Sequence, residues 1–158
     1  MAQDLSEFER WFSHILAAIE PEKRQRAIMQ LGQAIRRANL QRIATNVDPD
    51  GRAMEPRKPR LDGRGKLRRQ GGKMFKGLRR LRNWKILADG DGVEIKPASS
   101  SVDRVAAVSQ FGEVDVVGRR RSGEPIRYRY PVRGILGIGA EDERRALEIA
   151  ESLISPPD

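Results

Sequence analysis

The chain has 158 residues, no cysteine and a net charge of +9, and 34% of its residues are charged while 38% are hydrophobic. This length suits one domain, and the lack of cysteine excludes disulfides and thiolate metal sites. No apolar run approaches the ~20 residues of a membrane span, and the acidic, amphipathic N-terminus is not typical of a signal peptide. We therefore expect a protein of a cytoplasm, or of a particle assembled in one.

The positive charge is concentrated in one segment. Between Arg52 and Lys85, fourteen Lys or Arg residues stand against only Glu55 and Asp62, so this segment carries +12 and the remainder carries −3. A basic block of this kind binds either nucleic acid or an acidic protein partner. It contains only two aromatic residues, which is few for base stacking. We therefore favour a solvated or partner-binding loop over a nucleic-acid site.

Two amphipathic helices are predicted at the N-terminus. Apolar residues recur every three or four positions over residues 4–19, and Pro21 begins a second helix over residues 22–44. On the charged face of the second helix we place Lys23, Arg24, Arg26, Arg36, Arg37 and Arg42. Because a tight turn joins the two helices, they should form an antiparallel pair over residues 4–45.

A turn and a long basic arm follow this pair. Pro49, Asp50 and Gly51 supply turn chemistry, and the alternating ligands and closing Glu of a calcium loop are lacking. Residues 52–72 are rich in Gly, Pro and basic residues and poor in apolar ones, so we expect a flexible arm that a partner can order. Our candidates for partner contacts in this arm are Arg57, Lys58, Arg60, Arg64, Lys66, Arg68 and Arg69.

An α+β part is predicted over residues 73–155, beginning with a helix and a β-hairpin. Helical spacing occurs at Met74, Phe75, Leu78 and Leu81. Residues 84–88 and 93–97 alternate in polarity around Asp-Gly-Asp-Gly, which predicts two antiparallel strands. Serine hydroxyls then cap a short helix that ends near Gly112, with Phe111 buried at its end.

The last third is predicted to contain two strands, a glycine turn and a helix. A short strand at residues 114–117 precedes an exposed loop at 118–123. A half-buried strand is indicated by the alternation of Ile126, Tyr128, Tyr130 and Val132 with Arg127 and Arg129. The turn Gly134–Gly139 then leads into a helix over residues 142–154. Its predicted buried face comprises Ala146, Leu147, Ile149, Ala150, Leu153 and Ile154.

These elements predict an α+β fold: an N-terminal antiparallel helix pair, a small antiparallel sheet with packed helices, and a long basic loop, all in one domain over residues 1–158. The sequence shows no group of residues that is typical of a catalytic, metal-binding or cofactor-binding site. The acidic cluster at 141–143 is explained by the helix start, and the only histidine, His14, lies beside an apolar stripe. The glycines of the arm lack the Gly-Lys-Ser/Thr ending of a phosphate-binding loop. We therefore predict no catalytic, cofactor-binding or metal-binding residues, and no enzyme.

Five stretches follow one another in an order that is typical of one family. They are NLQRIATNVDPDG, PRKPR, KMFKGLRRLR, RVAAVSQFG and RYPVRGILGIGAEDE, within residues 37–145. The chain thereby resembles the phage virion morphogenesis family, which contains the tail-completion proteins of contractile-tailed phages. The positions that carry the motifs are Pro49, Asp50, Gly51, Gln110, Phe111, Gly112, Arg133, Leu136, Gly137 and Asp142. One departure is Ser109, where family members commonly carry His.

The resemblance implies a structural role in a virion that is assembled in the cytoplasm of a bacterial host, from a free phage, a prophage or a tail-like particle. Such proteins finish the tail and allow it to join the filled head at the neck, often as sixfold rings. The implied partners are other neck and tail proteins and further copies of the chain, with no membrane. The basic arm and Arg133 would then contact neighbours, and DNA contact is not required. The alternative is a nucleic-acid-binding module that uses Arg52–Lys85.

Overall fold

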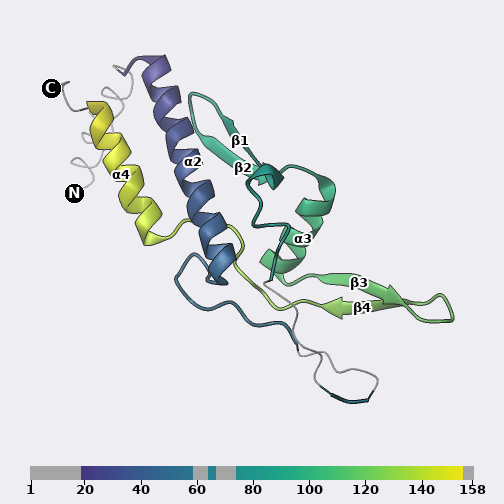
Figure 1. Ribbon diagram of the computed structural model, residues 1–158. Coiled ribbons are helices and arrows are strands. Elements are labelled where there is room, and N and C mark those ends of the chain that lie inside the picture. The colour runs from purple at the N-terminus through teal and green to yellow at the C-terminus, as the bar shows by residue number, and fades with distance from the viewer. Residues whose placement is uncertain (1–18, 59–63, 67–73, 155–158) are drawn as a thin grey trace, which may run out of the picture.

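The computed structural model describes residues 19–58, 64–66 and 74–154. In chain order the elements are α2 (Pro21–Thr45), the 3₁₀ helix η1 (Leu81–Asn83), β1 (Trp84–Ala88), β2 (Val93–Pro97), α3 (Ser100–Phe111), β3 (Val114–Arg119), β4 (Pro125–Arg129) and α4 (Ala140–Ile154). The fold is α+β, as predicted. The described strands form two separate antiparallel pairs, β1–β2 and β3–β4, where one sheet was expected. Figure 1 shows α2 beside α4, with β3–β4 projecting at the other end of the molecule.

Part of the prediction lies outside the described residues. This concerns the helix at residues 4–19, and with it the antiparallel helix pair, as well as Arg60, Arg68 and Arg69. The described stretches of the arm are exposed to solvent, apart from Met54, which is 7% exposed. The arm is therefore attached to the protein body near its beginning.

Helix α2 is the long element on which α4 and the β1–β2 hairpin pack. It begins at Pro21, as the sequence predicted, and ends where Asn46 adopts a left-handed φ of 57°. The buried Gly32 lies where α2 crosses the β1–β2 hairpin, because a Cβ there would be 2.4 Å from Cγ2 of Val93. Glycine thus permits a close helix–sheet contact, although it lowers helix propensity.

The core lies between α2, the β1–β2 hairpin and the segments around them. Its buried members are Ile43, Met54, Met74, Leu78, Trp84, Ala106 and Ile135. The β1–β2 hairpin has the predicted strand bounds. Helix α3 is capped by Ser99, whose hydroxyl accepts from the backbone N of Val102, and it ends at Gly112 with φ 66°.

The prediction that Phe111 is buried was wrong, since its side chain is 69% exposed. Helix α3 packs through Ala106, Val108 and Ser109. At about 100° per residue, Phe111 lies roughly 140° around the helix from Ala106 and points away from the core.

The helix predicted from Met74 was also wrong, because residues 74–79 form turns. Phe75 has a left-handed φ of 55°. The Leu78 carbonyl accepts from the indole Nε1 of the buried Trp84 at 2.7 Å, and the Gly77 carbonyl accepts from Asn83 Nδ2 at 2.7 Å. Side chains thus take the carbonyls that a helix would use, although the apolar spacing did identify Met74 and Leu78 as core residues.

The last third differs from the prediction in its burial. Strand β4 ends at Arg129, and Val132, expected in a half-buried strand, is 69% exposed. Helix α4 has nearly the predicted bounds, but Leu147 and Ile154 of its expected buried face are 66% and 52% exposed, and Ala150 is exposed as well. The other three residues of that expected face, Ala146, Ile149 and Leu153, are half-buried, and they lie on the inward side of α4 with the buried Asp142.

Candidate functional site

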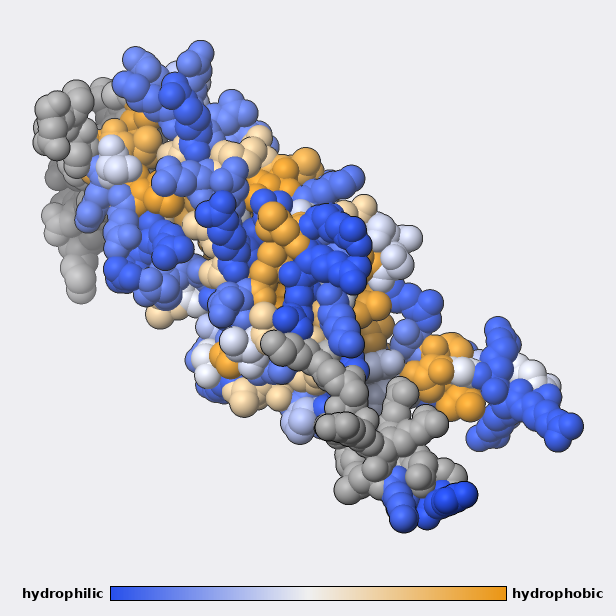
Figure 2. Space-filling model, in the orientation of Figure 1, coloured by the Kyte–Doolittle hydropathy of each residue, from blue (hydrophilic) through white to orange (hydrophobic). Residues whose placement is uncertain are grey.

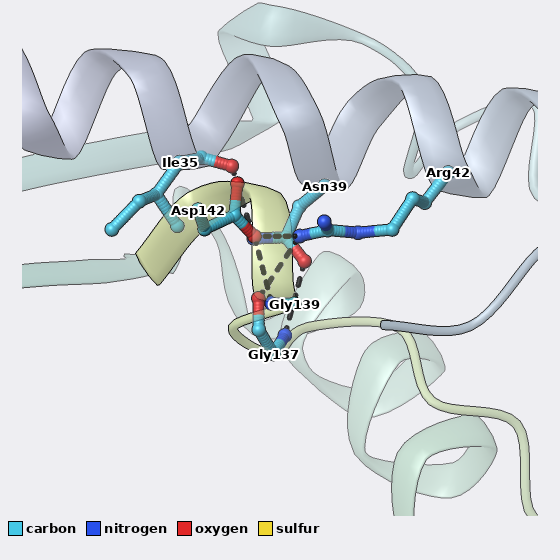
Figure 3. A network of polar contacts seen from close by, with 6 residues as sticks. All are labelled: Ile35, Asn39, Arg42, Gly137, Gly139 and Asp142. Atoms are coloured by element: carbon cyan, nitrogen blue, oxygen red, sulfur yellow. Dashed lines mark hydrogen bonds and ion pairs between the residues drawn. The ribbon is translucent and has the colours of Figure 1, made fainter. Parts of the chain in front are cut away.

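A network of polar contacts joins α2 to the turn Gly134–Gly139 (Figure 3). Asn39 is 2% exposed; its Oδ1 accepts from the Gly137 N at 3.0 Å, and its Nδ2 donates to the Ile35 carbonyl at 3.0 Å. One turn further along α2, Arg42 Nη2 donates to the Gly137 carbonyl at 3.1 Å. Both backbone groups of Gly137 are thus bound by side chains of α2. We call this network, together with Asp142, the polar seam.

Asp142 connects the seam to α4. Its Oδ2 accepts from Arg42 Nη2 at 2.7 Å and from the backbone N of Gly139 at 2.9 Å. The second bond is the reciprocal half of a capping box, in which the third helical residue binds the N-cap amide. The Asp142 side chain is 3% exposed and that of Arg42 is 16% exposed. Removing one partner would therefore leave a buried charge without its counter-ion.

The Pro-Asp-Gly turn packs directly on the glycine turn. A Cβ at Gly137 would lie 2.4 Å from Cγ of Pro49, and a Cβ at Gly139 would lie 2.6 Å from the Pro49 carbonyl oxygen. Neither glycine has a left-handed φ, so the lack of a side chain serves close approach. The Pro-Asp-Gly motif and the glycine turn, which are far apart in the sequence, are therefore in direct contact in the structure.

Gln110 brings the third motif to the same turn. Its Oε1 accepts from the backbone N of Ile135 at 2.7 Å and of Leu136 at 2.9 Å, and its Nε2 donates to the Leu136 carbonyl at 3.1 Å. Ile135 is 1% exposed and belongs to the core. Of the Gln-Phe-Gly motif, Gln110 holds the turn, Gly112 ends α3, and Phe111 faces solvent.

Arg133 attaches the beginning of the basic arm to the protein body. It is 7% exposed; its Nε donates to the Glu55 carbonyl at 2.6 Å, and its Nη2 donates to the Pro56 carbonyl at 3.2 Å. The guanidinium lies 5.9 Å from the centre of the Phe75 ring. Desolvation lowers the pKa of Arg133, and the nearby Glu55 carboxylate acts in the opposite direction. A contact between Arg133 and a neighbouring subunit stays a prediction.

The other predicted contact residues within the described ranges lie on the surface. Arg57, Lys58, Arg64 and Lys66 are exposed. Lys58 Nζ lies 5.1 Å above the Tyr128 ring, and the other three residues also have interaction partners.

Sequence reasoning missed Asn39 and misplaced Arg42. We placed Arg42 on the charged outer face of its helix, but it forms a partly buried ion pair. The available signal was Asn39, an amide within the apolar face of a helix, because buried amides require hydrogen-bond partners.

The seam holds three segments of one chain together, and Oδ2 of its carboxylate binds both Arg42 and the Gly139 amide. Within the described ranges, no three His, Cys, Asp or Glu side chains come close enough to hold a metal ion. None of the helices in the same ranges is both long and apolar enough to cross a bilayer.

No curated protein and no solved structure matches the chain. A family model described as the phage virion morphogenesis family matches residues 3–155. Members of this family are structural proteins rather than enzymes, and they act in the assembly of the phage virion and its tail together with other virion proteins. With nearly its whole length matched, the chain belongs to the phage virion morphogenesis family.

Proposed function

We propose that the protein completes the phage tail and helps to join it to the head at the neck, as a closed ring of identical subunits. The observation that carries the proposal is the β3–β4 hairpin, which projects from the body (Figure 1). Its two strands pair with one another, and their contacts with every other helix and strand that the structure describes are marginal.

This hairpin presents apolar side chains to solvent. Val114, Val116, Val117 and Ile126 are between 41% and 51% exposed. Figure 2 shows hydrophobic side chains gathered over the hairpin, next to a hydrophilic tip. A two-stranded hairpin is marginally stable by itself and gains stability from a third strand or a covering helix. A neighbouring subunit supplies such a cover in an assembled ring.

The basic arm serves the same assembly in this proposal. Arg133 fixes the beginning of the arm at Glu55 and Pro56, so the basic residues that follow leave the body at a defined place. They then contact an acidic surface of a neighbour. Deleting residues 57–71 should reduce assembly of tailed particles while leaving the body folded. Unchanged assembly and infectivity would show that the arm has no such role.

A second candidate function is nucleic-acid binding. It is favoured by the exposed arginines at the hairpin tip, Arg119, Arg120 and Arg121, together with the basic arm. Binding of this kind weakens steeply as the salt concentration rises. Tight binding of duplex DNA with a steep salt slope would favour this candidate over contact between proteins.

Rescue of incomplete particles tests the proposed function. Purified protein is added to phage heads and tails from cells that lack it, and joined, infectious particles are counted. The proposal predicts that wild-type protein restores joining. If joining is complete without the protein, the assignment to the neck is contradicted.

A further inference from the structure

We propose that the β3–β4 hairpin of one subunit docks on the outward face of helix α4 of the next copy. This inference rests on the proposed ring and names the two surfaces that close it. Both surfaces are exposed, each combines apolar side chains with charged ones, and the net charges of the two elements are opposite.

The strand register defines the donor surface. Val114 pairs with Arg129 and Val116 pairs with Arg127, and directly opposed residues of an antiparallel pair share one face. This face, which we call the open hairpin face, therefore has two valines on β3 beside two arginines on β4. All four residues are exposed.

The other face of the hairpin is less available. There, Tyr128 is half-buried, its ring lies 5.0 Å from that of Tyr130 in an edge-on arrangement, and Lys58 lies over it. The base of the hairpin is also fixed, because Arg104 of α3 forms an ion pair with Asp115. The open hairpin face is thus the side that remains for a partner.

The acceptor surface lies on α4, in what we call the α4 stripe. Leu147 and Ile154 are two turns apart, so they share one side of the helix, and they are 66% and 52% exposed. Glu143 and Glu151 lie four residues on either side of Leu147 and are exposed on the same side. The stripe therefore combines apolar contact area with carboxylates.

The charges of the two elements are complementary. Residues 114–129 carry five arginines against two acidic residues, a net charge of +3, and Ala140–Ile154 carries five acidic residues against two arginines, a net charge of −3. Two copies of the hairpin would repel one another, and so would two copies of α4. Complementary charge therefore favours contact between the hairpin of one copy and α4 of another, and it fixes how the two surfaces align.

The arrangement in space requires this contact to be intermolecular. In Figure 1 the hairpin projects from the end of the molecule opposite to α4, so a subunit cannot cover its own stripe with its own hairpin. A contact between two different patches of identical subunits is heterologous, and it closes into a ring when the rotation between neighbours allows. The occupant of the α4 stripe is therefore a second copy of this chain.

Disulfide trapping tests the contact, since the chain has no cysteine of its own. Single-cysteine variants V114C and V116C are each mixed with L147C or I154C and oxidised at low thiol concentration. We expect at least one of the four mixtures to form disulfide-linked dimers several-fold more than a mixture of L87C with L147C. Leu87 is a matched control because it is 47% exposed on β1.

Three results would overturn the docking contact. The first is that no mixture yields more disulfide-linked dimer than the L87C and L147C control. The second is that V116C forms dimers with itself more readily than with L147C. The third is an intramolecular disulfide in the double variant F12C/L147C, which would assign the stripe to the N-terminal segment of the same chain. If the wild-type protein nevertheless forms rings by native mass spectrometry, the proposed function stands while this interface does not.

Discussion

The polar seam and the β3–β4 hairpin are built in opposite ways. In the seam, Asn39, Arg42 and Asp142 are polar side chains in a largely buried setting, and each is bound to groups of the same chain. In the hairpin, valines are exposed and no neighbouring element of the described chain covers them. The first region fixes the fold of the subunit, whereas the second leaves apolar area open to another molecule. Substitutions should separate the two regions, because the seam determines stability and the hairpin determines assembly.

The largest loss of stability is expected for Asp142→Ala. This substitution leaves the Arg42 guanidinium without its counter-ion and frees the Gly139 amide, so the free energy of unfolding should fall by about 3–5 kcal/mol. Denaturant unfolding measures it. The exposed Glu143→Ala in the same turn is the control and should lose less than about 1 kcal/mol. Equal losses in the two variants would contradict the role of the seam.

Gln110→Ala is expected to have the next largest effect. Two backbone amides and one carbonyl of residues 135–136 lose their partner, and a buried unpaired group of this kind costs about 1–3 kcal/mol. We expect a loss near the upper end of this range, with faster amide exchange at Ile135 and Leu136. Gln33→Ala, on the exposed side of α2, should change neither property. An equal effect of both substitutions would show that the bonds from Gln110 to residues 135–136 do not hold the turn.

Gly137→Ala tests the close approach of the two turns. The added methyl group meets the Pro49 ring, and overpacking of this kind costs about 1–3 kcal/mol. Gly92→Ala adds a methyl group in open space and should stay within about 0.5 kcal/mol of wild type. Adding Pro49→Ala to Gly137→Ala should recover part of the loss, since the two sites are coupled. Additive losses would mean that the contact is unimportant.

Val116→Ser should have the smallest effect on stability and a large effect on assembly. The side chain is 41% exposed in the subunit, so the free energy of unfolding should change by less than about 0.5 kcal/mol. Particle joining in the rescue assay should nevertheless be lost. A loss of stability comparable to that of Gly137→Ala would mean that the hairpin belongs to the core of the subunit.

The sequence predicted the helices and strands well where a residue next to the element, such as a proline or a turn glycine, marks its end. The bounds of α2 and of the β1–β2 hairpin followed from Pro21 and from the Asp-Gly-Asp-Gly turn. The helix expected from Met74 did not form, because Asn83 and Trp84 bind the carbonyls of its residues. Apolar spacing identifies the residues that are buried, but it does not tell a helix from a series of turns.

The polar seam could be predicted only in part. The motifs around Pro49, Gln110 and Gly137 were identified, but their meeting at one turn depends on how α2 and α4 pack. Arg42 was assigned to solvent since most arginines on a charged helix face are exposed. The exposure of Leu147 was equally unpredictable, because an apolar residue on an amphipathic helix carries the same signal whether its own chain or a neighbour covers it.

Native mass spectrometry of wild type and Val116→Ser, with Leu87→Ser as the control, tests the central claim most directly. The account predicts a single ring-sized assembly for the wild type and for Leu87→Ser, and a folded monomer for Val116→Ser. If Val116→Ser retains the full ring, the hairpin is not the surface by which the subunits assemble.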